Sequence, residues 1–223
     1  MRPDVKRSYD STGRQRQAEA NRVAVVDAAE RLFRDAGYAA TSVASVADEA
    51  GVSVQTVYRT FRGKPGLVRA IYERGLRGAG GEAAYERSDS IRERAQDPRE
   101  LFRRWGELTT EVASVVSPIR LLMRSAALSD PEMEDLLRAT DEERLVRMRH
   151  HAEFLQARGF LRPGVRVAEA TDVLWTTSSV ELYDLLVLQR GWTHAAFADF
   201  VAELMTTALV GGHGSARSRS GRP

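Results

Sequence analysis

Apolar positions recur at helical spacing along most of the chain, and no stretch alternates strictly between apolar and polar residues as a half-buried strand does. Over residues 17–36 the apolar side chains fall on one helical face, and Gly37 follows where a helix typically ends. The pattern therefore predicts an all-α protein whose first helix stops at this glycine.

Two short helices are predicted next. The first covers 43–50, with Thr41 or Ser42 as its N-cap, and Gly51 supplies the turn that follows it. The second covers 53–61, where a serine again stands at the N-cap position. A short helix, a glycine turn and another short helix together suggest a helical hairpin.

The rest of the chain also reads as helix. A fourth helix starts at Lys64-Pro65, because proline is tolerated in a first turn, and the Gly-rich segment 75–90 is either its end or a hinge. Longer helices are predicted over 98–116, 118–128, 131–158, 167–189 and 193–211. The polar residues 212–223 are expected to be disordered.

Composition narrows the class of protein. The 223 residues are 43% hydrophobic and include no cysteine, which supports a packed core and excludes disulfides and thiolate chemistry. The polar, basic start of the chain does not resemble a signal peptide, and no apolar run reaches the ~18–20 residues of a membrane span. We expect a cytoplasmic protein with no contact to membranes.

Charge is distributed unevenly although the net charge is only +2. Residues 1–77 hold 14 Lys and Arg against 9 Asp and Glu, whereas residues 78–214 hold 16 against 22. A basic front on an acidic body suggests an anionic partner for the front alone. Because 31 of the basic residues are arginine, a GC-rich coding bias is an alternative source of this basicity.

The predicted hairpin has the residues that a helix-turn-helix requires. Ala47 and Ala50 are small where the helices cross, Gly51 allows a positive φ in the turn, and Val57 holds the second helix inward. Polar side chains are left on the outer side, near the N-terminus of that second helix, as in a recognition helix that enters the major groove. A plain hairpin packed for stability is the alternative.

The sequence around the hairpin decides between these two interpretations. The run "AAERLFRDAGYAATSVASVADEAGVSVQTVYRTFRGKPGLVRAIY" and the residues just before it, together 22–72, resemble the N-terminal domain of the TetR family of bacterial transcriptional regulators. The resemblance implies a flexible basic arm over 1–16, a helix-turn-helix DNA-binding domain over 17–75, and a larger helical ligand-binding and dimerisation domain over 76–211.

The resemblance also implies DNA contacts for eight residues. They are Ser42, Ser53, Val54, Gln55, Thr56, Tyr58, Arg59 and Lys64. Ser42, Tyr58 and Lys64 would bind phosphates, while the others would face the major groove, where Gln55 suits adenine and Arg59 suits guanine. A core-edge tyrosine and a solvated lysine are the alternatives for Tyr58 and Lys64.

Two features of this interface stay open. The family often has glycine where Gln55 stands, so the larger side chain either extends base readout, which we favour, or obstructs close approach. The basic arm, with Lys6, Arg7, Arg14 and Arg16, either lies along the minor groove or is a disordered leader.

A second copy of the chain is the expected protein partner. Residues 182–188 are apolar on nearly every side, with Asp184 as the one charge, and a helix of this kind must be buried all round. The resemblance implies a homodimer through a four-helix bundle built from the last two long helices. A monomer with an internal central helix is the alternative.

Aromatic residues and methionines in the body are candidates for a pocket that binds a small apolar or aromatic effector. They are Phe102, Trp105, Met123, Met148, His151, Phe154, Trp175 and Thr176, each of which is alternatively a core residue. His150, His151 and Glu153 lack the spacing of a metal site, and no catalytic or cofactor-binding motif is present.

These observations lead to one functional expectation. The chain is predicted to be a dimeric repressor that a small organic effector releases from a near-palindromic, double-stranded DNA operator. It is not expected to be an enzyme, to need a cofactor or to hold a metal. A transcriptional activator of the same fold is the nearer alternative, and an all-α small-molecule binding protein or enzyme the more distant one.

Overall fold

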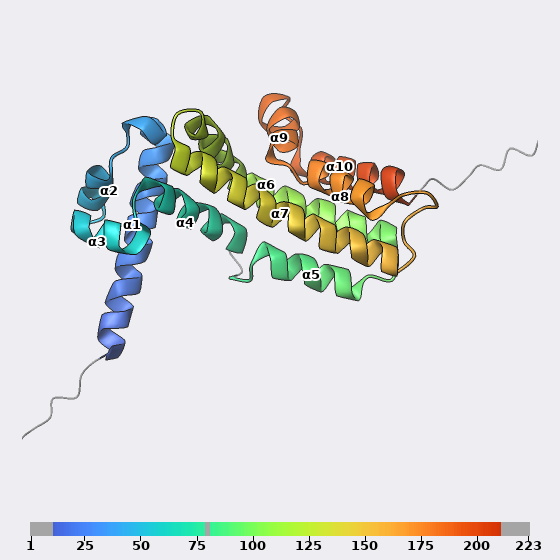
Figure 1. Cartoon of the computed structure of the whole chain (residues 1–223), viewed down its shortest axis with the longest axis horizontal. Helices are drawn as coiled ribbons and strands as arrows, with labels where there is room; N and C mark the ends of the chain where they lie inside the picture. Colours follow the sequence, from blue (N-terminus) through green and yellow to red (C-terminus); the bar gives the residue numbers. More distant parts are fainter. Residues whose placement is uncertain (1–10, 79–80, 211–223) are drawn as a thin grey trace, which may run out of the picture.

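A computed structural model describes residues 11–78 and 81–210, which form helices and connecting turns with no strand among them (Figure 1). The all-α prediction is confirmed. The helices are α1 Ser11–Ala40, α2 Val43–Glu49, α3 Val54–Phe61, α4 Lys64–Arg77, α5 Ala84–Arg94, α6 Pro98–Ala127, α7 Pro131–Ala157, α8 Val167–Thr177, α9 Val180–Tyr183 and α10 His194–Leu209. A π-helical segment, Asp184–Gln189, continues α9.

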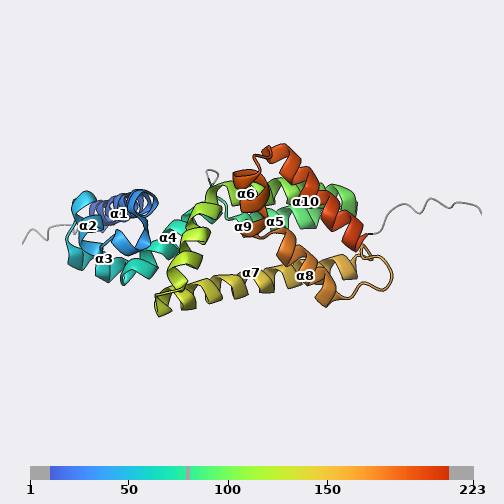
Figure 2. The same ribbon diagram turned by 90° about the horizontal axis from the view of Figure 1, so that it is seen from above.

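The helices gather into two regions that α4 joins. Helices α1 to α3 lie together at one end, and α5 to α10 form the longer body, in which α6 and α7 pack on each other and diverge from the turn that joins them (Figures 1 and 2). Helix α10 packs along α6, and α8 packs along α7. Helix α4 contacts both regions, because it packs on α1 and α3 and also on α6 and α7.

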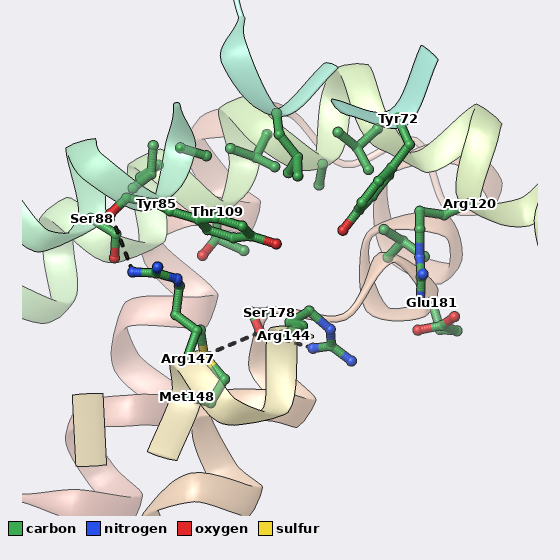
Figure 3. A pocket seen from close by; sticks show the side chains of 17 residues that line it. Tyr72, Tyr85, Ser88, Thr109, Arg120, Arg144, Arg147, Met148, Ser178 and Glu181 are labelled. Atoms are coloured by element: carbon green, nitrogen blue, oxygen red, sulfur yellow. Dashed lines mark hydrogen bonds between the residues drawn. The ribbon is translucent and has the colours of Figure 1, made fainter. Parts of the chain in front are cut away.

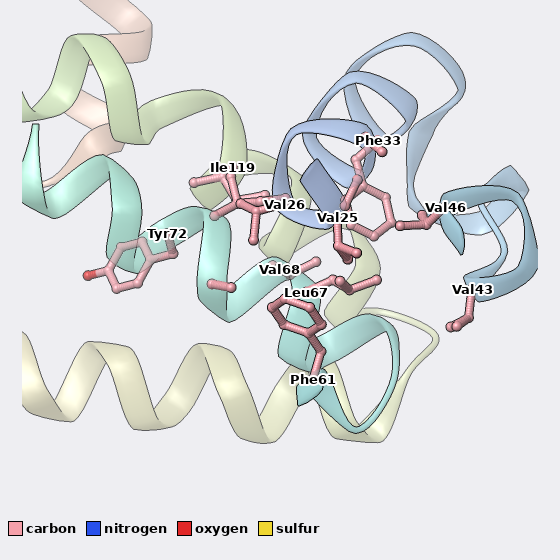
Figure 4. Close-up of a cluster of buried hydrophobic side chains, with 14 of the residues drawn as sticks. Val25, Val26, Phe33, Val43, Val46, Phe61, Leu67, Val68, Tyr72 and Ile119 are labelled. Carbon is pink, nitrogen blue, oxygen red and sulfur yellow. The ribbon is translucent and has the colours of Figure 1, made fainter. Parts of the chain in front are cut away.

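An apolar cluster fills the small end and continues into the body. Val46, Val57 and Leu67 are fully buried at the junction of α2, α3 and α4, and the same cluster extends to Ile119 on α6 and Met133 on α7 (Figure 4). The helix-turn-helix is therefore packed directly on the body. The domain boundary that the sequence suggested between residues 75 and 76 stays a prediction. The apolar cluster includes residues on both sides of this position.

A second apolar cluster holds the far part of the body together. Phe102 and Trp105 of α6 are buried against Phe197 and Val201 of α10. The two helices approach closely at Gly106, since a Cβ there would lie 2.4 Å from the carbonyl oxygen of Ala198. Glycine lets the two backbones come this near.

The first helix departs from the prediction at its start. It begins at Ser11 rather than near residue 17, so residues 11–16 are helical where a flexible arm was expected, and their Arg and Gln residues favour helix. Gly37 ends the regular helix as predicted, with φ +80°. The rest of the predicted arm, with Lys6 and Arg7, and the predicted tail 212–223 lie outside the described residues.

Two predicted breaks are placed differently. Pro118, expected to start a helix, lies inside the 30-residue α6, which bends along its length (Figure 2). A proline removes one helical hydrogen bond and can kink a helix without ending it when packing holds the helix on both sides. The buried Ile119 provides such packing directly after Pro118.

The predicted helix 167–189 is, in contrast, interrupted, because Ser179 caps α9 with its side chain.

The segment 75–90, predicted as a helix end or a hinge, contains the start of an additional helix. Helix α5 is strongly polar, and Ala84 and Ser88 are its buried residues. Arg87 holds it to α6 through an ion pair with Glu111 at 2.7 Å. Among the described residues no helix is both long and apolar enough to cross a membrane.

Candidate nucleic-acid interface

The turn between α2 and α3 is held by its own backbone. Gly51 adopts φ +66°, as the sequence predicted for a tight turn. The amide of Val52 donates to the carbonyl of Ala47 at 3.0 Å, which closes the end of α2. Beyond the turn, Val57 is fully buried, so the orientation of α3 is fixed by its inner face.

Serines cap both helices of the hairpin. The Ser42 hydroxyl accepts from the Ser45 amide at 3.0 Å, and the Ser45 hydroxyl accepts from the Ser42 amide at 3.1 Å, which forms a capping box. Ser53 accepts from the Thr56 amide at 3.1 Å, and their two hydroxyls lie 2.8 Å apart. A hydroxyl has three hydrogen-bonding positions, so these caps leave capacity for a further partner.

The outer face of α3 presents the side chains that were predicted to read DNA. Val54 is 42% exposed and Tyr58 is 53% exposed, and Gln55 and Arg59 are exposed beside them. Phe61 lies on the opposite, buried face. The structure thus brings Ser53, Val54, Gln55, Thr56, Tyr58 and Arg59 onto or beside one surface of a short helix.

Lys64 stands apart from this group. Its ammonium donates to the carbonyl oxygen of Tyr38 at 2.7 Å and lies 4.0 Å from the centre of the Tyr38 ring. Tyr38 in turn donates its hydroxyl hydrogen to Asp130, the N-cap of α7, at 2.6 Å. One of the three ammonium hydrogens is therefore engaged within the protein, and Lys64 links α4 to the corner between α1 and α2.

Arg62 is a neighbouring cation that sequence reasoning missed. It is exposed and ends α3 with φ +64°, a conformation that residues other than glycine rarely adopt. The sequence "FRGK" could have indicated Arg62 as a further candidate, because Arg62 and Lys64 are cations on either side of Gly63.

The predicted pocket residues separate into two groups. A cavity of about 120 Å³ lies between α4, α5, α6 and α7, and a smaller one of about 50 Å³ adjoins it. Of the predicted pocket residues, Met148 lines both cavities, and Trp105 and His151 line the smaller one. His151 is buried, with Nε2 2.9 Å from the Ser88 hydroxyl, and this burial lowers its pKa to about 3.

The other candidates lie elsewhere. Phe102 and Met123 are fully buried core residues, because each points into an apolar cluster between helices. Phe154 stacks edge-on against Phe160, and Trp175 packs beneath the Arg144 guanidinium. Thr176 is exposed, and the next residue along α8, Thr177, lines the smaller cavity in its place.

Sequence reasoning missed the polar side of the larger cavity. Arg120, Arg144 and Arg147 line it together with the side chains of Tyr72 and Tyr85 (Figure 3). Burial raises the pKa of Tyr72, which keeps its hydroxyl protonated. Within the described ranges, no group of His, Cys, Asp or Glu is arranged to hold a metal.

Comparison with known proteins identifies the hairpin and its surroundings. Residues 25–71, from α1 to α4, match the model of the bacterial regulatory proteins of the tetR family. A stretch of 47 residues is 43% identical to YvkB of Bacillus subtilis strain 168, which is described as an uncharacterized HTH-type transcriptional regulator. Residues 25–71 therefore form a helix-turn-helix domain of the TetR family. The stretch shared with YvkB covers 21% of this chain and 25% of that protein.

Solved structures extend the likeness in fold over most of the chain. A structure described as a TetR-family transcriptional regulator of Syntrophomonas wolfei superposes with a TM-score of 0.69 and 18% identity, covering 85% of this chain and 94% of the other. FadR of Bacillus subtilis, solved with stearoyl-CoA, gives a TM-score of 0.66 and 19% identity over 86% and 100% of the two chains.

A third solved structure, the SmeT–triclosan complex, gives a TM-score of 0.67 and 20% identity over 87% and 93% of the two chains. At such identities the likeness concerns the fold. The fold of these structures, a helix-turn-helix on a helical body, therefore extends over most of this chain.

Proposed function

We propose that this TetR-family regulator is a repressor that binds a near-palindromic DNA operator as a dimer. The observation that carries the proposal is the outer face of α3, where Gln55 and Arg59 are exposed beside Tyr58 on a helix whose other face is buried. Amide and guanidinium groups can each make two hydrogen bonds to a base edge, which is the contact that distinguishes base pairs in the major groove.

A dimer is supported by the exposed apolar side chains near the end of the chain. Leu185 is 52% exposed and Leu188 is 53% exposed, although the segment that holds them is almost entirely apolar. Leu204 of α10 is also exposed, while Phe197 and Val201 pack on α6. A second copy of the chain would cover the leucines that the monomer leaves in water.

The dimer is tested by its mass in solution. Leu185→Glu and Leu188→Glu place a charge in the proposed interface and are expected to give monomers in light scattering after gel filtration. Leu128→Glu is the control. Leu128 is more exposed than Leu185 and Leu188, at 89%, but it lies at the turn between α6 and α7, outside the proposed interface. A monomeric wild-type protein, or dimeric Leu185 and Leu188 variants, would contradict the proposal.

DNA binding is tested by selection from random duplexes, followed by footprinting on the selected site. Wild-type protein should protect two half-sites about 34–36 Å apart, or a multiple of this distance. Gln55→Ala should change the base preference by about 1–3 kcal/mol at one or two positions of each half-site. Lys64→Ala should weaken binding to all sequences alike, because phosphate contacts carry no sequence information.

Tyr58→Phe is the second variant for phosphate contact, since Lys64 also bonds to Tyr38 within the protein. Equal losses on selected and random DNA for Gln55→Ala would reject base readout by Gln55. No protected site in any selection would reject the DNA-binding proposal. Repressor and activator are separated by a reporter gene behind the selected site, whose expression should rise when the protein is removed if the protein is a repressor.

The effector is proposed to bind in the cavity between α4, α5, α6 and α7 and to release the protein from DNA. The cavity is the supporting observation, because helix α4 lines it with Tyr72 and Leu76 and also contacts the hairpin. Release requires that effector and operator prefer different conformations, with a coupling of about 1–3 kcal/mol.

A further inference from the structure

The larger cavity has two unlike sides (Figure 3). Apolar side chains of α4 and α6, such as Leu76 and Val112, form one side. On the other side, three guanidinium groups approach the same space, those of Arg120, Arg144 and Arg147. A purely apolar ligand would offer these guanidinium groups no partner, and a buried charge without a partner is unfavourable.

Two of the three arginines have a carboxylate within hydrogen-bond distance. Arg147 Nη1 lies 3.1 Å from both carboxylate oxygens of Asp89. Arg120 is almost completely buried; its Nη2 donates to Asp141 at 2.5 Å and its Nη1 to the Thr140 hydroxyl at 2.6 Å. Each of these two cations therefore has a close anionic partner within the protein.

Arg144 is the cation that is not balanced in this way. Its Nη1 donates to two neutral acceptors, the carbonyl of Trp175 and the Ser178 hydroxyl, the latter at 3.0 Å. The nearest carboxylate, Asp141, lies 3.9 Å from its Nη2 and already accepts from Arg120. Only 15% of the Arg144 side chain is exposed, and this burial lowers its pKa, which is the electrostatic sign of a charge held away from water.

The remaining ionised groups around the cavity lie closer to other arginines or carboxylates than to Arg144. Glu181 also lines the cavity, but its Oε1 is 2.6 Å from Nε of Arg124. Arg92 lies 3.3 Å from Asp89, which it shares with Arg147. Within the described residues these ion pairs form three separate groups, which together hold five guanidinium groups and three carboxylates, so two positive charges are left over. The members are Arg92, Arg120, Arg124, Arg144, Arg147, Asp89, Asp141 and Glu181.

We propose that this cavity binds an organic carboxylate, with its carboxylate group on Arg144 and its apolar body against the α4 and α6 side. The inference rests on the proposed function only in taking the cavity as the effector site. A planar guanidinium matches a carboxylate in two parallel hydrogen bonds, and such charge-assisted bonds are strongest away from water. The Tyr72 and Tyr85 side chains project into the same space and offer hydroxyl donors (Figure 3).

The size of the space limits the apolar body of the acid. The larger cavity measures about 120 Å³, and the adjoining one adds about 50 Å³. A protein cavity of about 150 Å³ holds a benzene molecule. The two cavities share Ser88, Thr109 and Met148, so a compact body could extend from one to the other. An aromatic acid or a short to medium-chain fatty acid fits these dimensions.

Matched ligands on the full-length protein without DNA test the proposal. Calorimetry compares phenylacetate with 2-phenylethanol and phenethylamine, and octanoate with octanol and octylamine. Within each set the apolar body is alike and the polar end changes from anion to neutral to cation. We expect each acid to bind at least about tenfold more tightly than its alcohol and the amine most weakly.

Variants then assign the preference to Arg144. Arg144→Gln should weaken acid binding by about tenfold or more and leave alcohol binding unchanged, because it removes the charge and keeps a polar side chain. Arg138→Gln is the control, since Arg138 is on the same helix, exposed, and paired with Asp135. Thermal melting establishes whether each variant folds. If Arg144→Gln does not fold, the ranking of acid, alcohol and amine on the wild-type protein decides alone.

Three results would overturn the inference: alcohols that bind as tightly as acids, no acid binding at millimolar concentration, or full acid binding by a folded Arg144→Gln. Failure of the proposed function gives a different result. If an acid binds but leaves the DNA complex intact, the site stands and effector release is wrong. If an alcohol releases DNA as well as its acid does, effector release stands and the carboxylate inference is wrong.

Discussion

Tyr38→Phe tests the contact that joins the DNA-binding end to the body. The Tyr38 hydroxyl donates to Asp130 at 2.6 Å, while its ring stacks on Phe33 and lies under the Lys64 ammonium. Phenylalanine keeps both ring contacts and removes the hydrogen bond. Bonds to charged groups contribute about 1.5–3 kcal/mol, and partial exposure of both partners places this one at about 1–1.5 kcal/mol.

This loss should be visible in thermal melting. For a chain of this length, 1 kcal/mol shifts the melting temperature by about 2–4 °C, so Tyr38→Phe should lower it by about 2–6 °C at neutral pH. Tyr58→Phe is the matched control, because that hydroxyl is exposed on α3, and its melting temperature should stay within about 1–2 °C of wild type.

The difference should also depend on pH. The Tyr38 hydrogen bond is the largest cause that lowers the pKa of Asp130 below its ordinary 3.8. A carboxyl group with a lowered folded-state pKa stabilises the fold above its unfolded value and loses that contribution as the pH falls through the folded value. The gap between wild type and Tyr38→Phe should therefore shrink below pH 3.8. Equal melting temperatures at neutral pH, or a gap that does not change with pH, would refute this reasoning.

Three further predictions concern packing and titration. Gly66→Ala should destabilise the fold by about 3 kcal/mol or more in urea unfolding, because the new Cβ would lie 1.6 Å from the carbonyl oxygen of Phe61. Thr41→Val should cost about 1–3 kcal/mol in the same assay, since its buried hydroxyl donates its single hydrogen to the Gly37 carbonyl at 2.8 Å, with the Leu32 carbonyl also near, at 3.1 Å. Burial lowers the pKa of His151 to about 3, so wild-type stability should fall from pH 6.5 downward by about 1.4 kcal/mol per pH unit from this group. His151→Gln should lose that slope and the exposed His150→Gln should keep it.

The hairpin could be predicted from sequence because its constraints are local. Gly51 must turn, Val57 must face inward, and serines before a helix cap it, so each residue is interpretable within a few positions of its neighbours. Helix α5 lacked such a signal, since Ala84 and Ser88 are its buried residues and its position depends on contacts with α6. Pro118 misled for a similar reason, because tertiary packing carries α6 through it.

The polar lining of the cavity could not be predicted from the sequence pattern. Arg144 and Arg147 are one turn apart on α7, whereas Arg120 comes from α6 and Tyr72 from α4. Arginines at such spacing are usually solvated, and only the packing of α6 on α7 brings these into one space. Looking for aromatic and methionine side chains selected core residues such as Phe102 in their place.

Helix α4 gives the two ends of the molecule a physical connection. Its first turn lies against α3, since Gly66 sits beneath the Phe61 carbonyl, and its last turns line the cavity through Tyr72 and Leu76. A straight helix carries a displacement at Leu76 over about 15 Å to Gly66. A ligand shifts an equilibrium only by its difference in affinity between two states. An effector can therefore change the position of α3 only if it binds more tightly to a position of α4 that the DNA complex does not adopt.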